Sequence, residues 1–139
     1  MSRIFAILLA AVAAVAVALS FTSPASASDT TMGCQVINNH GGASGGFRLN
    51  FCGTFFADSS YVIDYAVQNG NGHFTWTVPA RSTKVGGCTT STPFCDVVVR
   101  ARTADQSFTA IVETLDSSGL SVVVSAEADI PAVCGSELC

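Results

Sequence analysis

YVIDYAVQNGNGHFTWTVP, residues 61–79, is the stretch that decides the fold. Its large apolar side chains at residues 61, 63, 65 and 67 face one way, and Asp64 and Gln68 face the other, which is the period of a half-buried β-strand. Residues 69–72, Asn-Gly-Asn-Gly, favour a tight hairpin turn, because Asn and Gly tolerate positive φ. Residues 74–78 then alternate again until Pro79 ends the strand. We therefore predict a β-hairpin from these residues.

The same two-residue period continues on both sides of this stretch. It recurs at residues 47–51, 97–101, 108–113 and 120–127, and residues 116–119, Asp-Ser-Ser-Gly, predict a further turn. No segment keeps the spacing of an amphipathic helix over three turns. About seven short strands predict an all-β protein, an antiparallel immunoglobulin-like β-sandwich. A small closed β-barrel is the alternative.

The first 27 residues have the features of an export signal. Arg3 precedes an apolar run over residues 4–19, and Ala25-Ser26-Ala27 is an A-x-A cleavage pattern. An uncleaved N-terminal anchor is the alternative, but no cationic stop-transfer flank follows. We predict a signal peptide over 1–27 and a single secreted, extracellular domain over 28–139, which is the size of one ordinary domain.

The charge of the mature chain restricts its partners. The whole sequence has a net charge of −4, and without Arg3 five basic residues stand against ten acidic ones. With no basic stripe in the sequence, we expect no direct nucleic-acid binding and no membrane binding after signal cleavage. We expect a monomer that needs no cofactor and meets neutral or cationic partners.

Six cysteines follow the signal: Cys34, Cys52, Cys88, Cys95, Cys134 and Cys139. An even number in a short exported chain predicts disulfides, and the absence of C-x2-C with only two histidines argues against a zinc site. Six cysteines allow fifteen pairings in principle. The preferred set joins neighbours in sequence, Cys34–Cys52, Cys88–Cys95 and Cys134–Cys139. Each closure would contribute roughly 2 to 3 kcal/mol.

One motif imitates a catalytic site. Residues 42–46, Gly-Ala-Ser-Gly-Gly, match the G-x-S-x-G nucleophile elbow, and His40 lies four residues before Ser44. The elbow requires a strand followed by a helix, whereas a strand is predicted here from residue 47. The acidic residues are scattered singly. We therefore expect a flexible glycine loop, no metal site, no catalytic residue and no enzyme.

Aromatic residues are the candidate binding residues. Phe55 and Phe56 are adjacent and cannot both point inward from a regular strand, and Phe94 lies between Cys88 and Cys95. Exposed aromatic side chains mark ligand clefts and partner contacts. With Trp76, these three form the predicted ligand-binding set.

Residues 69–99 resemble one known family. Asn-Gly, a strand ending Thr-Val, and Cys88-Thr-Thr leading to Cys95 and a valine strand are similar to the later part of the neocarzinostatin-type chromoproteins. The resemblance implies an exported immunoglobulin-like sandwich that carries an enediyne chromophore in an apolar cleft, with Cys88–Cys95 as a structural disulfide. Six cysteines in place of that family's four, and a chain beyond Leu115 without counterpart, depart from the pattern.

These observations predict a secreted, non-enzymatic binding protein. Its ligand would be a small apolar molecule, in the most specific form an antibiotic chromophore, held in a cleft near the Cys88–Cys95 loop. Two alternatives remain open. One is a protein-binding module, such as an inhibitor of a secreted hydrolase. The other is a structural component of the cell surface.

Overall fold

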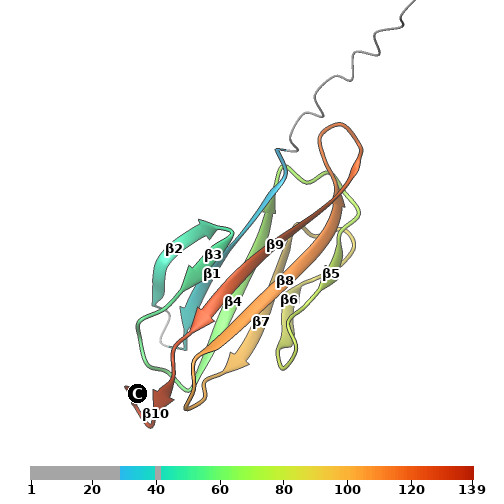
Figure 1. Ribbon diagram of the computed structural model, residues 1–139. Helices are drawn as coiled ribbons and strands as arrows, with labels where there is room; N and C mark the ends of the chain where they lie inside the picture. The colour runs from blue at the N-terminus through green and yellow to red at the C-terminus, as the bar shows by residue number, and fades with distance from the viewer. Residues whose placement is uncertain (1–28, 40–41) are drawn as a thin grey trace, which may run out of the picture.

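The computed structural model describes residues 29–39 and 42–139, so the predicted signal peptide and His40 lie outside the described residues. The described part of the chain contains strands and turns (Figure 1). The strands are β1 (Thr31–Asn38), β2 (Ala43–Leu49), β3 (Phe51–Gly53), β4 (Ser60–Gln68), β5 (Thr75–Thr77), β6 (Thr83–Gly87), β7 (Phe94–Arg100), β8 (Gln106–Leu115), β9 (Ser121–Ile130), β10 (Val133–Cys134) and β11 (Glu137–Leu138).

Two sheets form the predicted β-sandwich. The five-stranded sheet has the order β2-β1-β4-β7-β6 and the four-stranded sheet has the order β3-β9-β8-β5, while β10 and β11 form a separate two-stranded pair. Neither sheet of the described residues closes on itself, so the barrel alternative is wrong. Strand pairing is antiparallel except between β3 and β9, which run parallel.

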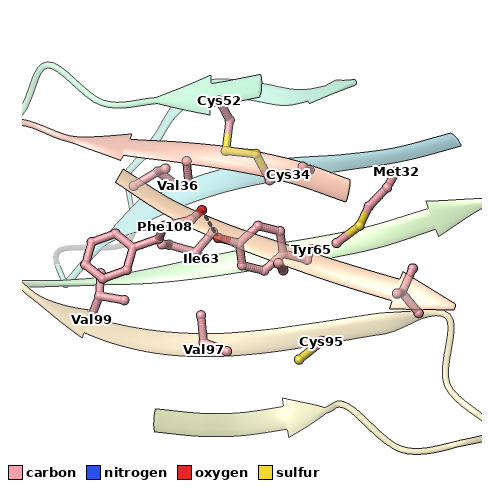
Figure 2. Close-up of a cluster of buried hydrophobic side chains, with 14 of the residues drawn as sticks. Met32, Cys34, Val36, Cys52, Ile63, Tyr65, Cys95, Val97, Val99 and Phe108 are labelled. Carbon is pink, nitrogen blue, oxygen red and sulfur yellow. Dashed lines mark hydrogen bonds between the residues drawn. A yellow bond between two sulfur atoms is a disulfide. The ribbon is translucent and has the colours of Figure 1, made fainter. Parts of the chain in front are cut away.

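The core lies between the two sheets and follows the alternation of the sequence. On β4, Tyr61, Ile63 and Tyr65 are fully buried, and the inward residues of β7 and β8 meet them. Two links cross the core (Figure 2). The Tyr65 hydroxyl donates a hydrogen bond to the carbonyl of Phe108 on β8, at 2.7 Å, and the Cys34–Cys52 disulfide joins β1 to β3. Burial and the charge of Glu127 raise the pKa of Tyr65, so its hydroxyl stays a donor.

The three disulfides are Cys34–Cys52, Cys88–Cys95 and Cys134–Cys139, which is the set preferred from sequence. Only the first of them joins the two sheets. Cys88–Cys95 closes the connection between β6 and β7, and Cys134–Cys139 closes the β10–β11 turn at the C-terminus. Three disulfides are typical of proteins from oxidising, extracellular compartments.

The hairpin predicted around residues 69–72 is wrong. Strand β4 lies in the five-stranded sheet, whereas β5 pairs with β8 in the other sheet. The positive φ angles that suggested a tight turn do occur, at Asn69, Gly72 and His73, but they carry the chain across from one sheet to the other. Phe74 is buried at the end of this crossing, and its amide donates to the carbonyl of Thr90 at 2.9 Å.

The prediction for residues 42–51 also needs correction. Residues 43–49 form β2, which pairs with β1, and not a glycine loop; Gly45 and Gly46 adopt positive φ where the register with β1 is irregular. The strand predicted over 47–51 is broken at Asn50, whose φ is 64°, and the chain passes there from β2 to β3 in the other sheet. Its apolar side chains are consequently exposed, not buried: Phe47, Leu49 and Phe51.

Candidate functional site

The four predicted binding residues lie at two ends of the sandwich. In the pairing of β4 with β7, Ala66 is opposite Phe94 at one end and Ser60 is opposite Arg100 at the other. We call the first the loop end, formed by residues 68–75 and 88–94. The second is the groove end, formed by residues 54–59, 101–107 and 129–133. Trp76 and Phe94 belong near the loop end, and Phe55 and Phe56 lie at the groove end, so the structure does not bring the four together.

Both aromatic side chains near the loop end contact the backbone of neighbouring residues. The indole nitrogen of Trp76 donates to the carbonyl of Thr92 at 3.1 Å, and the side chain is half-buried. Phe94 is 40% exposed, and its ring lies over Gly87, where a Cβ atom would come within 2.6 Å of the ring. Here Trp76 braces the disulfide-closed loop, and Phe94 covers the backbone beside it.

The groove end carries a large open groove, which we call the aromatic groove. Its volume is about 780 Å³. Phe51, Phe55 and Phe56 line it, and their side chains are 51%, 88% and 58% exposed. The remaining lining comes from β2, β3, β8 and β9 and their adjoining loops: Gly45, Arg48, Gly53, Thr54, Asp105, Gln106, Ser107, Glu127, Asp129, Ile130 and Pro131.

A braced loop holds two of these rings in solvent. Residues 54–59 connect β3 to β4, and Phe56 NH donates to the Thr54 hydroxyl at 3.2 Å. The buried Tyr61 hydroxyl donates to the carbonyl of Phe56 at 2.7 Å and accepts from the amide of Asp58 at 2.8 Å. A tyrosine that bonds back to the backbone a few residues upstream is the tyrosine corner of immunoglobulin-like domains.

Asp58 completes the bracing of this loop. Its carboxylate is buried and accepts from the amides of Asn39, at 2.8 Å, and Ser59, at 2.6 Å. These bonds give the two backbone amides a partner within the protein, and the bond from Asn39 ties the loop to the end of β1. The loop conformation is therefore set by buried polar contacts, and the two phenylalanine rings do not contribute to it by burial.

The third ring, Phe51, belongs to β3, whose position is fixed by a disulfide and by pairing with β9. It precedes Cys52, which is buried and bonded to Cys34 across the sandwich. In the parallel pairing of β3 with β9, Phe51 lies opposite Glu127. Phe51 was not predicted as a site residue, because in the sequence it occupies an inward position of an apparently continuous strand. The signal that could have found it is Asn50, which favours the positive φ that breaks that strand.

Polar groups surround the rings. Asp105, Glu127 and Asp129 lie along the side formed by β8, β9 and their adjoining residues, and Arg48 lies on the side of β2. The Ser107 hydroxyl donates to the Glu127 carboxylate, and Asp105 accepts from the amide of Ala132 at 2.7 Å. The lining of the groove thus combines three aromatic side chains with predominantly acidic polar groups, which we call its rim.

The serine of the G-x-S-x-G motif does not occupy the position that a nucleophile elbow requires. Ser44 lies within β2, paired with Val36, and not on a strand-to-helix elbow. Within residues 29–39 and 42–139, no group of three or more His, Cys, Asp or Glu side chains is arranged to hold a metal ion. The same residues include no helix long and apolar enough to cross a membrane.

One pair of acids is close. Asp64 on β4 lies directly opposite Asp96 on β7, on the outer face of the five-stranded sheet. Partial burial, with the neighbouring carboxyl of Asp96, raises the pKa of Asp64 to about 6. A pair of like charges across two strands weakens the sheet, and a shared proton relieves the repulsion.

Comparison of this chain with protein-family models, with curated proteins and with solved structures finds no match in any of the three.

Proposed function

We propose that this protein is a secreted, non-enzymatic binding protein that holds a small, largely apolar molecule in the aromatic groove. One observation carries the proposal. Three phenylalanine side chains line a groove of about 780 Å³ while more than half of each ring is exposed. Pockets for small ligands in proteins commonly occupy 300 to 1,000 Å³, roughly, and are lined by aromatic side chains with a few polar groups.

Folding leaves these rings exposed and therefore does not gain the free energy that their burial would provide. Burying a phenylalanine side chain contributes about 1.5 to 3 kcal/mol, and Phe55 and Phe56 are kept outside the core by a loop that buried hydrogen bonds hold in place. A loop that is already ordered loses little conformational entropy on binding. This preorganisation supports a binding role for the groove.

The rim defines the chemistry of the ligand further. Three carboxylates and one Arg line the groove together with the three aromatic side chains. Such a rim favours a ligand whose apolar body carries hydroxyl or cationic groups, because these can donate hydrogen bonds to carboxylates. The antibiotic-chromophore form of the proposal, which comes from the resemblance, would place its ligand near Cys88–Cys95. Our proposal places it at the opposite end of the sandwich.

Titration with the neutral fluorescent dye Nile red tests the groove directly. We expect saturable binding to the folded protein, and we expect Phe51→Ala and Phe56→Ala to weaken it about tenfold each, the loss that corresponds to one ring contact. Phe94→Ala is the matched control, because it removes an exposed ring at the loop end. Equal weakening by Phe94→Ala, or no saturable binding, would contradict the proposal.

Native mass spectrometry of protein purified from its own culture medium identifies the natural occupant. A bound small molecule that is lost in the Phe51→Ala variant supports the proposal. A stoichiometric protein partner on the same groove would replace it with the protein-binding alternative, and a ladder of homo-oligomers would favour the structural one.

A further inference from the structure

A second groove at the groove end is lined by arginines, and we call it the cationic groove. Its volume is about 370 Å³. Arg81 precedes β6, Arg100 ends β7, and Arg102 follows two residues later. The remaining lining residues are Thr83, Val85, Val98 and Gln106. The cationic groove therefore lies beside β6 and β7, and it shares Gln106 with the aromatic groove.

The concentration of positive charge here is unusual for this protein. The five basic residues beyond Arg3 stand against ten acidic ones, yet three of the five line this one groove. No ion pair joins these three arginines to another residue of the described chain. Unpaired guanidinium groups that converge on a groove repel one another unless an anion lies between them. The groove thus has the electrostatics of an anion site.

Arg81 is held in a backbone conformation that its side chain does not favour. Its φ is 65°, in the left-handed region where glycine is the preferred residue. It lies in the exposed turn between Val78 and β6, where the Ser82 hydroxyl donates to the carbonyl of Pro79 at 2.7 Å. Such outliers concentrate at functional sites. The conformation of Arg81 therefore adds to the case for a functional role of its guanidinium, which rests on its place in the groove.

Gln106 adds a polar group that lacks a partner. Its side-chain oxygen is buried and makes no hydrogen bond with the described part of the protein. Buried carboxamide groups in folded proteins are nearly always hydrogen-bonded, and the two ends of the amide can exchange places by rotation. A group that enters the groove can complete this bonding, either as a donor to the oxygen or as an acceptor from the rotated NH₂.

We propose that the cationic groove binds an oxoanion group, namely the phosphate, sulfate or carboxylate of a small molecule. Guanidinium forks match the paired oxygens of such groups, and the Thr83 hydroxyl and the Gln106 carboxamide add neutral hydrogen bonds. This inference does not rest on the proposed function, because the three arginines that carry it do not line the aromatic groove, and Gln106 is the one lining residue that the two grooves share.

The test uses inorganic phosphate, sulfate and acetate as separate probes against the full mature chain. In two-dimensional NMR titrations at low salt, we expect saturable shifts of the Arg81, Arg100, Arg102 and Gln106 side-chain signals. Phosphate and sulfate carry more negative charge and more oxygens than acetate, so three guanidinium groups should bind them more tightly, and the rank order identifies which oxoanion the groove fits. Saturation by acetate alone restricts the site to carboxylates. Shifts that stay linear with every probe overturn the proposal.

Variants separate a specific site from a general charge effect. We expect Arg100→Ala with Arg102→Ala to weaken binding of the preferred anion more than tenfold. Lys84→Ala is the control, because it removes one positive charge from β6 outside the groove. If Lys84→Ala weakens binding as much as a single arginine variant, the binding is non-specific and the proposal is wrong.

Arg81→Gly distinguishes function from folding. Glycine suits the positive φ at this position, so we expect a melting temperature no lower than that of the unmodified protein. We expect the same variant to lose at least fivefold in anion affinity. An unchanged affinity would remove Arg81 from the site, and anion binding would then not account for its backbone conformation.

Discussion

The two ends of the sandwich use aromatic residues and disulfides in opposite ways. At the loop end, Cys88–Cys95 closes the β6–β7 connection, Trp76 hydrogen-bonds to the loop, and Phe94 covers Gly87. At the groove end, the loop over residues 54–59 contains no cysteine, yet it holds Phe55 and Phe56 in solvent. The difference teaches that a covalent staple need not mark the surface that we propose for binding. Buried polar contacts can present a side chain just as firmly.

The two ends also differ in what their hydrogen bonds connect. Around the disulfide-closed loop the hydrogen bonds join one segment to the next, as from Val67 NH to Pro93 O at 2.8 Å, and they close that end of the core. Around residues 54–59 the bonds end on Tyr61 and Asp58, which hold a backbone from which the Phe55 and Phe56 side chains face outward. The first end is therefore closed by contacts between its own segments, and the second presents exposed side chains.

The largest test of this comparison removes one disulfide at a time. Cys34→Ala with Cys52→Ala should lower the free energy of unfolding by about 3 kcal/mol, and Cys88→Ala with Cys95→Ala by about 2.5 kcal/mol, since the closed loops differ in length. Urea denaturation measures both. Only the first pair should also weaken Nile red binding, because Cys52 positions Phe51. Weaker dye binding in the second pair would break the distinction between the ends.

A matched pair of tyrosine variants tests the same comparison with a smaller expected change in the free energy of unfolding. Tyr61→Phe and Tyr65→Phe each delete one buried hydroxyl and should lower the free energy of unfolding by about 1 to 2 kcal/mol. Of the two hydroxyls, only that of Tyr61 bonds to the loop over residues 54–59, so only Tyr61→Phe should also lower dye affinity. Thermal denaturation with dye titration checks this. Equal dye affinity in the two variants would show that the loop does not depend on the tyrosine corner.

The smallest expected effect is a pH dependence from the sheet between the two ends. Asp64 faces Asp96 on β7 and neutral Gln35 on β1, and its pKa is raised from 3.8 to about 6. Its proton is held more tightly in the folded state, so its contribution to stability is complete below about pH 4 and is lost as the pH rises through 6.

We therefore expect the free energy of unfolding to fall by roughly 0.5 to 1 kcal/mol between pH 4 and pH 7, since solvent screens a half-exposed pair. Asp64→Asn should remove this slope and leave dye binding unchanged. A slope that persists in Asp64→Asn would assign the pH dependence to another group. The pKa of Asp116 is lowered by hydrogen bonds from Ser118 and Leu120, so any change in stability from Asp116 occurs below pH 4 and outside the range from pH 4 to pH 7.

Much of the fold could be predicted from local patterns. Alternation identified β4, β7, β8 and β9, and the Asp116–Gly119 turn joins β8 to β9 as predicted, with Asp116 NH donating to Leu120 O at 2.8 Å. Four strands were not predicted: β1, β6 and the short pair β10 and β11. Strand β1 has inward Met32, Cys34 and Val36, an alternation that is present in the sequence, whereas β6, Thr-Lys-Val-Gly-Gly, has no such pattern because it is an edge strand.

The candidate sites were harder to predict for a physical reason. Phe55 and Phe56 were identified from their adjacency, but their neighbour in the groove, Phe51, was assigned to the core. The cationic groove was not foreseen at all, because Arg81 and Arg100 are far apart in sequence and meet only through the pairing of β6 with β7. The number of charged residues in a sequence gives the net charge of the chain, but it does not show which charged side chains lie together in the fold.

By itself, the sequence determined that this protein is an all-β domain with three disulfides, because strand periodicity and cysteine spacing are local properties. Tertiary structure alone decided that residues 69–74 cross between sheets and do not form a hairpin. It also decided that Phe51, Phe55 and Phe56 share one groove and that three arginines share another. Such choices depend on which strands pair, and strand pairing is set by contacts between residues distant in the chain.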